Sequence, residues 1–305
     1  MFFSGFADEA AYDVDGQIVA TLTLGWNNLE WRNVDGINVS DMSDEAFETA
    51  LGAFSDNGVR VSCFGSVIAN WSVSPFDDEA FEQTKIKLSR TLRRMNQANC
   101  NLLRGMSFAV QRNLPPDDPD WETQVFAKVR KLVEMCADYG VIYGHENCMN
   151  YGGQSYRHTL KLLQNVNMDN FKLIFDTGNP VFTDFRVGEK PYKKQSSWEF
   201  YRQVKDFITY VHIKDGRFLR DGVGIFPEVD YTMPGEGDGE VKRIVTDLLA
   251  GGYDGGFSIE PHMTRIFHQA DNTNPPDDTT PMLEYLRYGV KFMKLVNEAK
   301  VELKK

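Results

Sequence analysis

Short apolar runs alternate along the whole chain with longer stretches in which apolar residues recur at every third or fourth position. The short runs predict buried strands, and the longer stretches predict helices with one buried face. Gly25, Gly58 and Gly140 directly follow three of the helical stretches, as is typical of residues that end helices. We expect strands at 2–7, 28–32, 59–65 and 102–106 and in four later runs that end at Glu146, Asp176, His212 and Glu260, and helices at 15–24, 43–57, 77–98, 120–139, 155–165, 197–204, 240–250 and 281–304.

Eight strands that alternate with helices indicate a parallel sheet of the α/β class. The length allows one large α/β domain or two smaller ones, and a closed (β/α)8 TIM barrel typically takes about 250 residues. The count of eight units favours one such barrel as a single domain over residues 1–305. An open dinucleotide-binding sheet is disfavoured, because residues 4–9 after the first strand lack the Gly-x-Gly-x-x-Gly pattern. Long loops are expected at 180–196, 216–239 and 263–280, after the last three strands, where they would overhang one face of the barrel.

Each of the last four strands ends on a side chain that can bind a metal ion: Glu146, Asp176, His212 and Glu260, separated by 30, 36 and 48 positions. Taken alone, Asp176 could be a turn residue and Glu146 a solvated strand end. Strands of a TIM barrel deliver their last residues to one face, however, so the four together predict a single oxygen-rich site for a divalent cation.

A divalent cation in such a site can bind two adjacent oxygens of a polyol or ketose. It would polarise the carbonyl and stabilise the enediolate that forms when a neighbouring proton leaves. A carboxylate held beside that carbon can serve as the base, and two carboxylates on opposite sides of the substrate can invert the carbon. The residue types therefore point to proton transfer next to a carbonyl.

In these motifs the chain resembles the sugar phosphate isomerase/epimerase family of the xylose isomerase-like TIM barrel superfamily. The superfamily includes ketose 3-epimerases, inosose dehydratase and endonuclease IV. The resemblance implies that Glu146, Asp176, His212 and Glu260 bind one metal ion, Mn²⁺ foremost, with Mg²⁺, Co²⁺ or Zn²⁺ as alternatives. It also implies that Glu146 and Glu260 form the proton-transfer pair. The most specific segments are residues 146–147, 176–179, 212–215, 235–237 and 259–262.

Substrate contacts are expected from residues near these ligands. Asn179 stands where ketose epimerases have a histidine, and asparagine can hydrogen-bond but cannot carry a proton at neutral pH. Arg217 is the nearest match to an arginine that contacts substrate in that group. Lys214 shares its strand side with His212 and is expected to point toward the substrate, which leaves Asp215 as a structural partner.

Three further residues are candidate substrate contacts. Glu30 and Arg32 share one side of the second strand, so they either reach the site or pair with each other. His262 follows the last ligand by two positions and is a candidate contact of the substrate or the ligands. Among the other histidines, His145 is expected outside the ligand set, and His158 and His268 are expected at the surface.

The sequence leaves more than one reaction open. An isomerase or epimerase of a ketose, keto-sugar or sugar phosphate is favoured. A dehydratase or other lyase would share the first step and then expel a hydroxyl, with Lys214 or His262 as candidate acids. A phosphodiesterase like endonuclease IV would need more than 5 histidines and a basic groove. A non-catalytic sugar-binding protein is disfavoured by the complete set of ligands.

The net charge limits the classes of partner that are expected, and the cysteines indicate the expected compartment. A formal charge of −11 disfavours nucleic acid and membrane surfaces, and no apolar run approaches the roughly 18 residues of a membrane span. The 4 cysteines form no Cys-x-x-Cys pair, and the N-terminus lacks a secretory signal, so reduced buried thiols in a cytoplasmic enzyme are expected. A small carbohydrate is the expected partner. The sequence does not fix the oligomeric state, although a homodimer is the commonest assembly.

Overall fold

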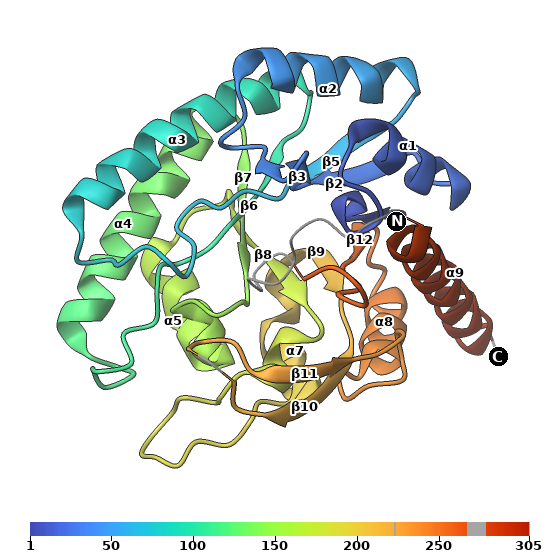
Figure 1. Ribbon diagram of the computed structural model, residues 1–305. Coiled ribbons are helices and arrows are strands. Elements are labelled where there is room, and N and C mark those ends of the chain that lie inside the picture. The colour runs from blue at the N-terminus through green and yellow to red at the C-terminus, as the bar shows by residue number, and fades with distance from the viewer. Residues whose placement is uncertain (223, 267–278, 305) are drawn as a thin grey trace.

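In a computed structural model of the chain, which describes residues 1–222, 224–266 and 279–304, eight parallel strands form a ring (Figure 1). Their order is β1-β12-β9-β8-β7-β6-β5-β2, and a parallel bridge between Phe6 and Glu30 joins the two ends of the series. The predicted (β/α)8 TIM barrel is confirmed. The strands are β1 (Phe2–Gly5), β2 (Asn28–Trp31), β5 (Arg60–Phe64), β6 (Leu102–Gly105), β7 (Ile142–Glu146), β8 (Phe171–Asp176), β9 (Ile208–Ile213) and β12 (Gly256–Ile259).

Helices surround the ring, and each predicted helix is present within about two residues of its expected bounds. Side chains cap several of their N-termini, because an aspartate or serine oxygen accepts a hydrogen bond from a backbone N–H in the first turn. Asp118, for example, accepts from the backbone of Trp121 at 3.0 Å. The helices are α1 (Val14–Thr23), α2 (Asp44–Asp56), α3 (Asp78–Gln97), α4 (Pro119–Ala137), α5 (Tyr156–Val166), α7 (Ser197–Val204), α8 (Val241–Ala250) and α9 (Thr279–Glu302).

The strands are almost entirely buried, because helices cover the outside of the ring and side chains fill its inside. Trp31 at the end of β2 shows how this core connects elements. Its ring stacks on Phe47 of α2 at 5.0 Å and on Phe64 of β5 at 5.9 Å between ring centroids. All four cysteines are buried and unpaired, as expected.

The long segments after β8 and β9 are more ordered than predicted. The segment 180–196 begins within the short helix α6 (Asn179–Phe182). Residues 216–239 contain an antiparallel hairpin of β10 (Gly216–Arg220) and β11 (Glu228–Tyr231), so the loop expected there is wrong in part. A smaller hairpin, β3 (Asn33–Val34) and β4 (Ile37–Asn38), follows β2. Most of the loop predicted at 263–280 lies outside the described residues. No helix within the described ranges is long and apolar enough to cross a bilayer.

Candidate metal centre

The four predicted ligands lie together at the carboxyl ends of neighbouring strands. Glu146 ends β7, Asp176 ends β8, His212 lies in β9, and Glu260 directly follows β12. Parallel register pairs Asp176 with His212, so successive strands deliver these side chains at the same level. One ligand atom from each of the four lies within 4.8 Å of the others, and all four residues are buried.

Each of the three carboxylates keeps one buried oxygen that accepts no hydrogen bond within the described ranges and lies beside a cationic side chain, Lys214 or Arg104. Glu146 Oε2, Asp176 Oδ2 and Glu260 Oε2 are buried without a hydrogen-bond partner among the described residues. The second oxygen of each carboxylate is engaged, for example Asp176 Oδ1 by the backbone N–H groups of Gly178 and Asn179 at 2.8 and 2.7 Å. Buried carboxylate oxygens that accept no hydrogen bond are costly, and the charges of Lys214 and Arg104 offset part of that cost. A divalent cation could bind the same oxygens. The donor set therefore fits one metal ion.

Glu30 fixes the orientation of the His212 ring. His212 Nε2 lies 3.0 Å from Glu30 Oε2, which also accepts a hydrogen bond from Ser258 at 2.8 Å. His212 Nδ1 lies 3.3 Å from Glu146 Oε1 and so faces the other ligands. Burial alone would lower the pKa of His212, but the Glu30 carboxylate and the hydrogen bonds outweigh it and raise the pKa to about 10. Of the two roles considered for Glu30, the structure places it against His212 and not against Arg32.

Lys214 and Asn179 lie within the ligand cluster. Lys214 Nζ is 2.7 Å from Glu260 Oε2, 3.0 Å from Asp176 Oδ2 and 3.2 Å from the Asn179 side-chain oxygen. Burial would lower the pKa of Lys214, but the charge of Asp176 and then of Glu260 raises it well above its ordinary value. The ammonium therefore offsets part of the negative charge, and it sits where a substrate oxygen near the cation could reach it.

Two buried arginines add positive charge beside the carboxylates of the cluster. Arg32, a predicted substrate contact, lies 2.8 Å from Asp8 and 3.0 Å from Glu260. Arg104 of β6 lies 3.6 Å from Glu146 Oε2 and was not predicted from the sequence. The signal that could have identified it is a single arginine inside the apolar run of a buried strand, where an unpaired charge is costly.

These charges set the ionisation of the carboxylates. Burial alone would raise the pKa of Glu146, but the Arg104 guanidinium outweighs it and lowers the pKa to about 2. Burial would likewise raise the pKa of Glu260, yet Lys214 holds it well below its ordinary value. For Asp176 burial prevails and raises the pKa to about 6. Glu146 and Glu260 are therefore ionised at neutral pH and able to accept protons.

His262 faces the same region from a strained backbone. Its φ of +54° lies in the left-handed region, which is uncommon for a residue other than glycine. The Glu9 carboxylate holds it, with Oε2 accepting from the His262 backbone N–H at 2.7 Å and Oε1 lying 2.9 Å from Nδ1. His262 Nε2 is left 3.8 Å from Glu260 Oε1. The structure therefore places this predicted contact beside the ligands.

A cavity of about 390 Å³ opens above the cluster. Arg217 is not among its lining residues: this exposed side chain hydrogen-bonds the Glu236 carbonyl and lies 3.6 Å from Asp230 on the β10–β11 hairpin. The structure therefore does not bring Arg217 to the site. Lining side chains from the predicted set are Arg32, Glu146, Asn179, Lys214, Glu260 and His262, and others that sequence reasoning missed are Asn33, Asn38, Arg104 and Tyr231.

The remaining histidines lie apart from the ligands. His145 Nε2 lies 2.9 Å from Ser107 Oγ and 3.1 Å from Asn150 Oδ1, outside the ligand cluster as expected. The surface position expected for His158 is wrong, because only 1% of it is exposed within α5. His268 lies outside the described residues.

Sequence comparison identifies the type of barrel. A family model described as xylose isomerase-like TIM barrel matches residues 19–289. Inosose dehydratase from Lactiplantibacillus plantarum is 26% identical over 152 residues, 47% of this chain and 47% of that protein. Inosose dehydratase from Lacticaseibacillus casei is 25% identical over the same length. The chain thus spans about half the length of the curated relatives it matches.

Solved structures share the fold at lower identity. D-Psicose 3-epimerase with D-tagatose from Clostridium cellulolyticum H10 has a TM-score of 0.67 at 16% identity, with 97% of this chain and 99% of that chain covered. A xylose isomerase-like TIM barrel protein from Mycobacterium smegmatis in complex with magnesium has a TM-score of 0.65 at 15% identity, with 97% of each chain covered. L-Ribulose 3-epimerase has a TM-score of 0.68 at 16% identity, covering 99% of this chain and 96% of that chain.

Proposed function

Since the chain belongs to the xylose isomerase-like TIM barrel family, we propose that it is a divalent-metal-dependent sugar isomerase or epimerase. It would move a proton next to the carbonyl of a ketose, keto-sugar or sugar phosphate. One observation carries the proposal: three buried carboxylates and one oriented imidazole bring ligand atoms within 4.8 Å of one another, and two of the carboxylates, Glu146 and Glu260, line a cavity. Sugar epimerases with the same fold support it.

Glu146, Asp176, His212 and Glu260 would hold the cation, and Mn²⁺ and Mg²⁺ suit this set of oxygen and nitrogen donors. When bound, a divalent cation polarises a carbonyl and stabilises the enediolate that follows proton loss. The Mycobacterium smegmatis protein of the same fold, whose structure is in complex with magnesium, supports the binding of an ion.

The protein's own groups would handle the proton. Glu146 and Glu260 are ionised and both line the cavity from separate strands, so one carboxylate can remove a proton and the other can return one to the opposite face. The Lys214 ammonium, 2.7 Å from Glu260, can donate a hydrogen bond to a substrate oxygen that gains negative charge. The Asn179 amide can orient a hydroxyl but cannot transfer its proton.

A dehydratase is the second candidate, and the inosose dehydratases among the relatives favour it. The same base would remove the proton, and an acid would protonate the departing hydroxyl so that it leaves as water. His262 suits that role in this structure. Glu9 holds its Nδ1 and backbone N–H, and its Nε2 faces Glu260.

Deuterium uptake tests the proposal. Metal-loaded protein in D2O would be incubated with ketoses, ketose phosphates and inososes and followed by NMR. Exchange at a carbon next to the carbonyl is expected, and the product separates epimerisation from loss of water. Saturation with metal and no exchange in any compound of the panel would contradict the proposed function.

The Glu146→Gln variant sharpens this test. It should fold but lose exchange, because an amide cannot accept the proton, whereas Glu122→Gln should keep it. Glu122 is a matched control, since it is also buried but pairs with Lys161 away from the cavity. Full exchange in Glu146→Gln would exclude Glu146 as the base.

A further inference from the structure

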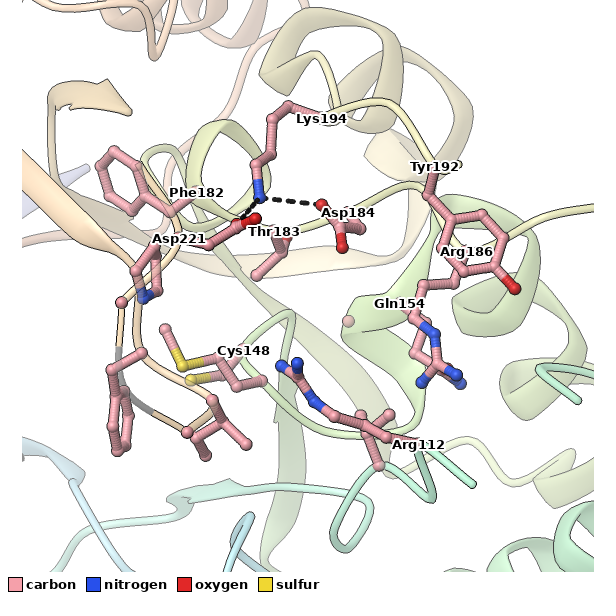
Figure 2. A pocket seen from close by; sticks show the side chains of 18 of the residues that line it. Arg112, Cys148, Gln154, Phe182, Thr183, Asp184, Arg186, Tyr192, Lys194 and Asp221 are labelled. Carbon is pink, nitrogen blue, oxygen red and sulfur yellow. Dashed lines mark hydrogen bonds and ion pairs between the residues drawn. The ribbon is translucent and has the colours of Figure 1, made fainter. Parts of the chain in front are cut away.

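A second cavity of about 350 Å³ adjoins the cavity of the candidate metal centre. Cys148, Met149 and Phe226 line both, so the two spaces meet along these side chains. The second cavity lies among the segments that follow β6, β7 and β8 and the tip of the β10–β11 hairpin (Figure 2). A ligand bound at the metal centre could therefore extend into it.

The walls of this second cavity are positively charged, although the chain as a whole carries −11. Four cationic side chains line it against two acidic ones. Lys194 engages both acids, with Nζ 2.8 Å from Asp184 and 3.2 Å from Asp221. The remaining cations, Arg112, Arg186 and Lys190, have no acidic oxygen within 4.0 Å in the part of the chain that the structure describes. The cavity thus presents uncompensated positive charge.

Arg186 carries the strongest sign of a missing ligand. Its Nη1 is buried and has no hydrogen-bond partner among residues 1–222, 224–266 and 279–304. Burial lowers the pKa of Arg186 and the positive charge of Arg112 adds to this, although Tyr192 and Asp184 raise it in part. In Figure 2 the Arg112 side chain extends into the cavity toward Cys148. The two acids of the lining, Asp184 and Asp221, pair with Lys194, so the repulsion between the Arg112 and Arg186 guanidinium groups is only partly offset. A bound anion would offset the rest.

Gln154 adds a complementary group. Its side-chain oxygen is buried without a hydrogen-bond donor among the described residues, while its amide nitrogen donates to the Tyr151 carbonyl. The cavity therefore offers an unused donor on Arg186 for an oxyanion and an unused acceptor on Gln154 for a hydroxyl. A hydroxylated compound with an anionic end has both partners.

We propose that this cavity is an anion subsite, in which Arg112 and Arg186 bind the phosphate or carboxylate group of a sugar whose carbonyl end lies at the metal centre. Binding of the anion by the two arginines is independent of the proposed function, whereas placing the carbonyl at the metal centre rests on it. Arginine suits the role because its planar donors match two oxygens of an oxyanion. The substrate class is then an anionic sugar, either a sugar phosphate or a sugar acid.

Binding of small anions tests the subsite without turnover. Metal-loaded protein would be titrated with inorganic phosphate, methyl phosphate and acetate by isothermal calorimetry. Saturable binding is expected, and Arg112→Met and Arg186→Met should each weaken it by about tenfold or more, because each removes a charged hydrogen bond. Arg157→Met removes an arginine that is exposed, as Arg112 is, but lies in α5 outside this cavity, and should leave binding unchanged.

The two sources of the anion give different results. Tighter methyl phosphate assigns the subsite to sugar phosphates, and tighter acetate assigns it to sugar acids. Binding that never saturates, or that keeps its affinity in both Arg112→Met and Arg186→Met, would overturn the subsite. Arg112 is exposed, so its variant keeps the test valid even if Arg186→Met fails to fold.

Failure of the subsite and failure of the proposed function are distinguishable. Anion binding that depends on Arg186, without deuterium exchange in any sugar, keeps the subsite and overturns the function. Exchange in neutral ketoses without anion binding keeps the proposed function and overturns the subsite. If both hold, Arg186→Met should raise KM for the anionic substrate about tenfold with little change in kcat, and should leave neutral sugars unaffected.

Discussion

At the scale of single residues, Glu30 determines which nitrogen of His212 is available to a cation. It engages Nε2 at 3.0 Å and leaves Nδ1 facing the carboxylates. Glu30→Gln should lower the affinity for Mn²⁺ or Mg²⁺ by about 10- to 100-fold, as is usual when the carboxylate behind a metal-binding histidine is lost. Calorimetric titration of metal into the variant measures this. Glu122→Gln is the matched control, and equal affinities for the two variants would remove Glu30 from this role.

His158 gives a second prediction, because a proton does not suit its surroundings. Burial lowers its pKa below the ordinary 6.5. The unfolded chain therefore takes up this proton at higher pH than the folded one, so stability is complete above about pH 6.5 and falls as the pH decreases. The free energy of unfolding, measured in urea between about pH 7.5 and 5, should fall less steeply in His158→Gln than in the wild type. Identical slopes would contradict the assignment.

Residue-level reasoning from the sequence succeeded where the fold alone dictates position. The convergence of Glu146, Asp176, His212 and Glu260 was predictable because parallel strands bring their carboxyl ends to one face. Glu30 was left between two roles, since its partner His212 lies 182 positions away and only the closed ring brings them together. Arg217 was expected at the substrate from the family resemblance, but it lies in the β10–β11 hairpin, where it is exposed and paired with Asp230. The residues around Arg217 do not predict the direction in which its side chain points.

At the scale of elements, Asp215 holds the β10–β11 hairpin to the barrel. Its carboxylate accepts hydrogen bonds from four backbone N–H groups, those of Gly216, Gly235, Gly237 and Gly239. A Cβ on Gly237 would lie 2.4 Å from Asp215 Oδ1, so this return segment requires glycine. The sequence predicted Asp215 as a structural partner, and the structure confirms it.

Asp215→Ala should therefore lower the free energy of unfolding by about 3 kcal/mol, because buried N–H groups lose a charged acceptor. Urea denaturation gives this value, and hydrogen exchange should rise locally over residues 216–239. Asp230→Ala, an exposed change in the same hairpin, should stay within about 0.5 kcal/mol of wild type. Equal losses in the two variants would contradict the anchoring role.

The hairpin itself was not predicted, and its composition explains why. β11 alternates between exposed and partly buried positions, but over only four residues, and β10 places Phe218 next to Leu219, so neither gives the longer alternation that marks a half-buried strand. The barrel helices were predictable for the opposite reason. Their apolar faces pack on the ring, and residues such as Ser43 and Asp77 cap their first turns.

At the scale of the whole molecule, the candidate ligands come from four neighbouring strands, so a bound cation would link much of the ring. Without it, three buried carboxylates lie close together, and Lys214 offsets part of their repulsion. Metal binding to the folded state alone adds about 4 kcal/mol at a thousandfold excess over Kd. We therefore expect the melting temperature to rise by several degrees when metal is added and to return to the metal-free value when a chelator removes it.

Lys214→Met separates this electrostatic argument from simple ligand binding. Removing the ammonium leaves the carboxylates with less compensation, so the metal-free variant should melt below metal-free wild type. It also removes a cation that competes for the same oxygens, 2.7 Å from Glu260 and 3.0 Å from Asp176, so the rise on adding metal should be larger than in wild type. Asp176→Asn should show the opposite, a smaller rise, because it loses a ligand. A metal-induced rise that is the same in all three proteins would show that the ion binds elsewhere, and the four strand ends would then be a charge network without a cation.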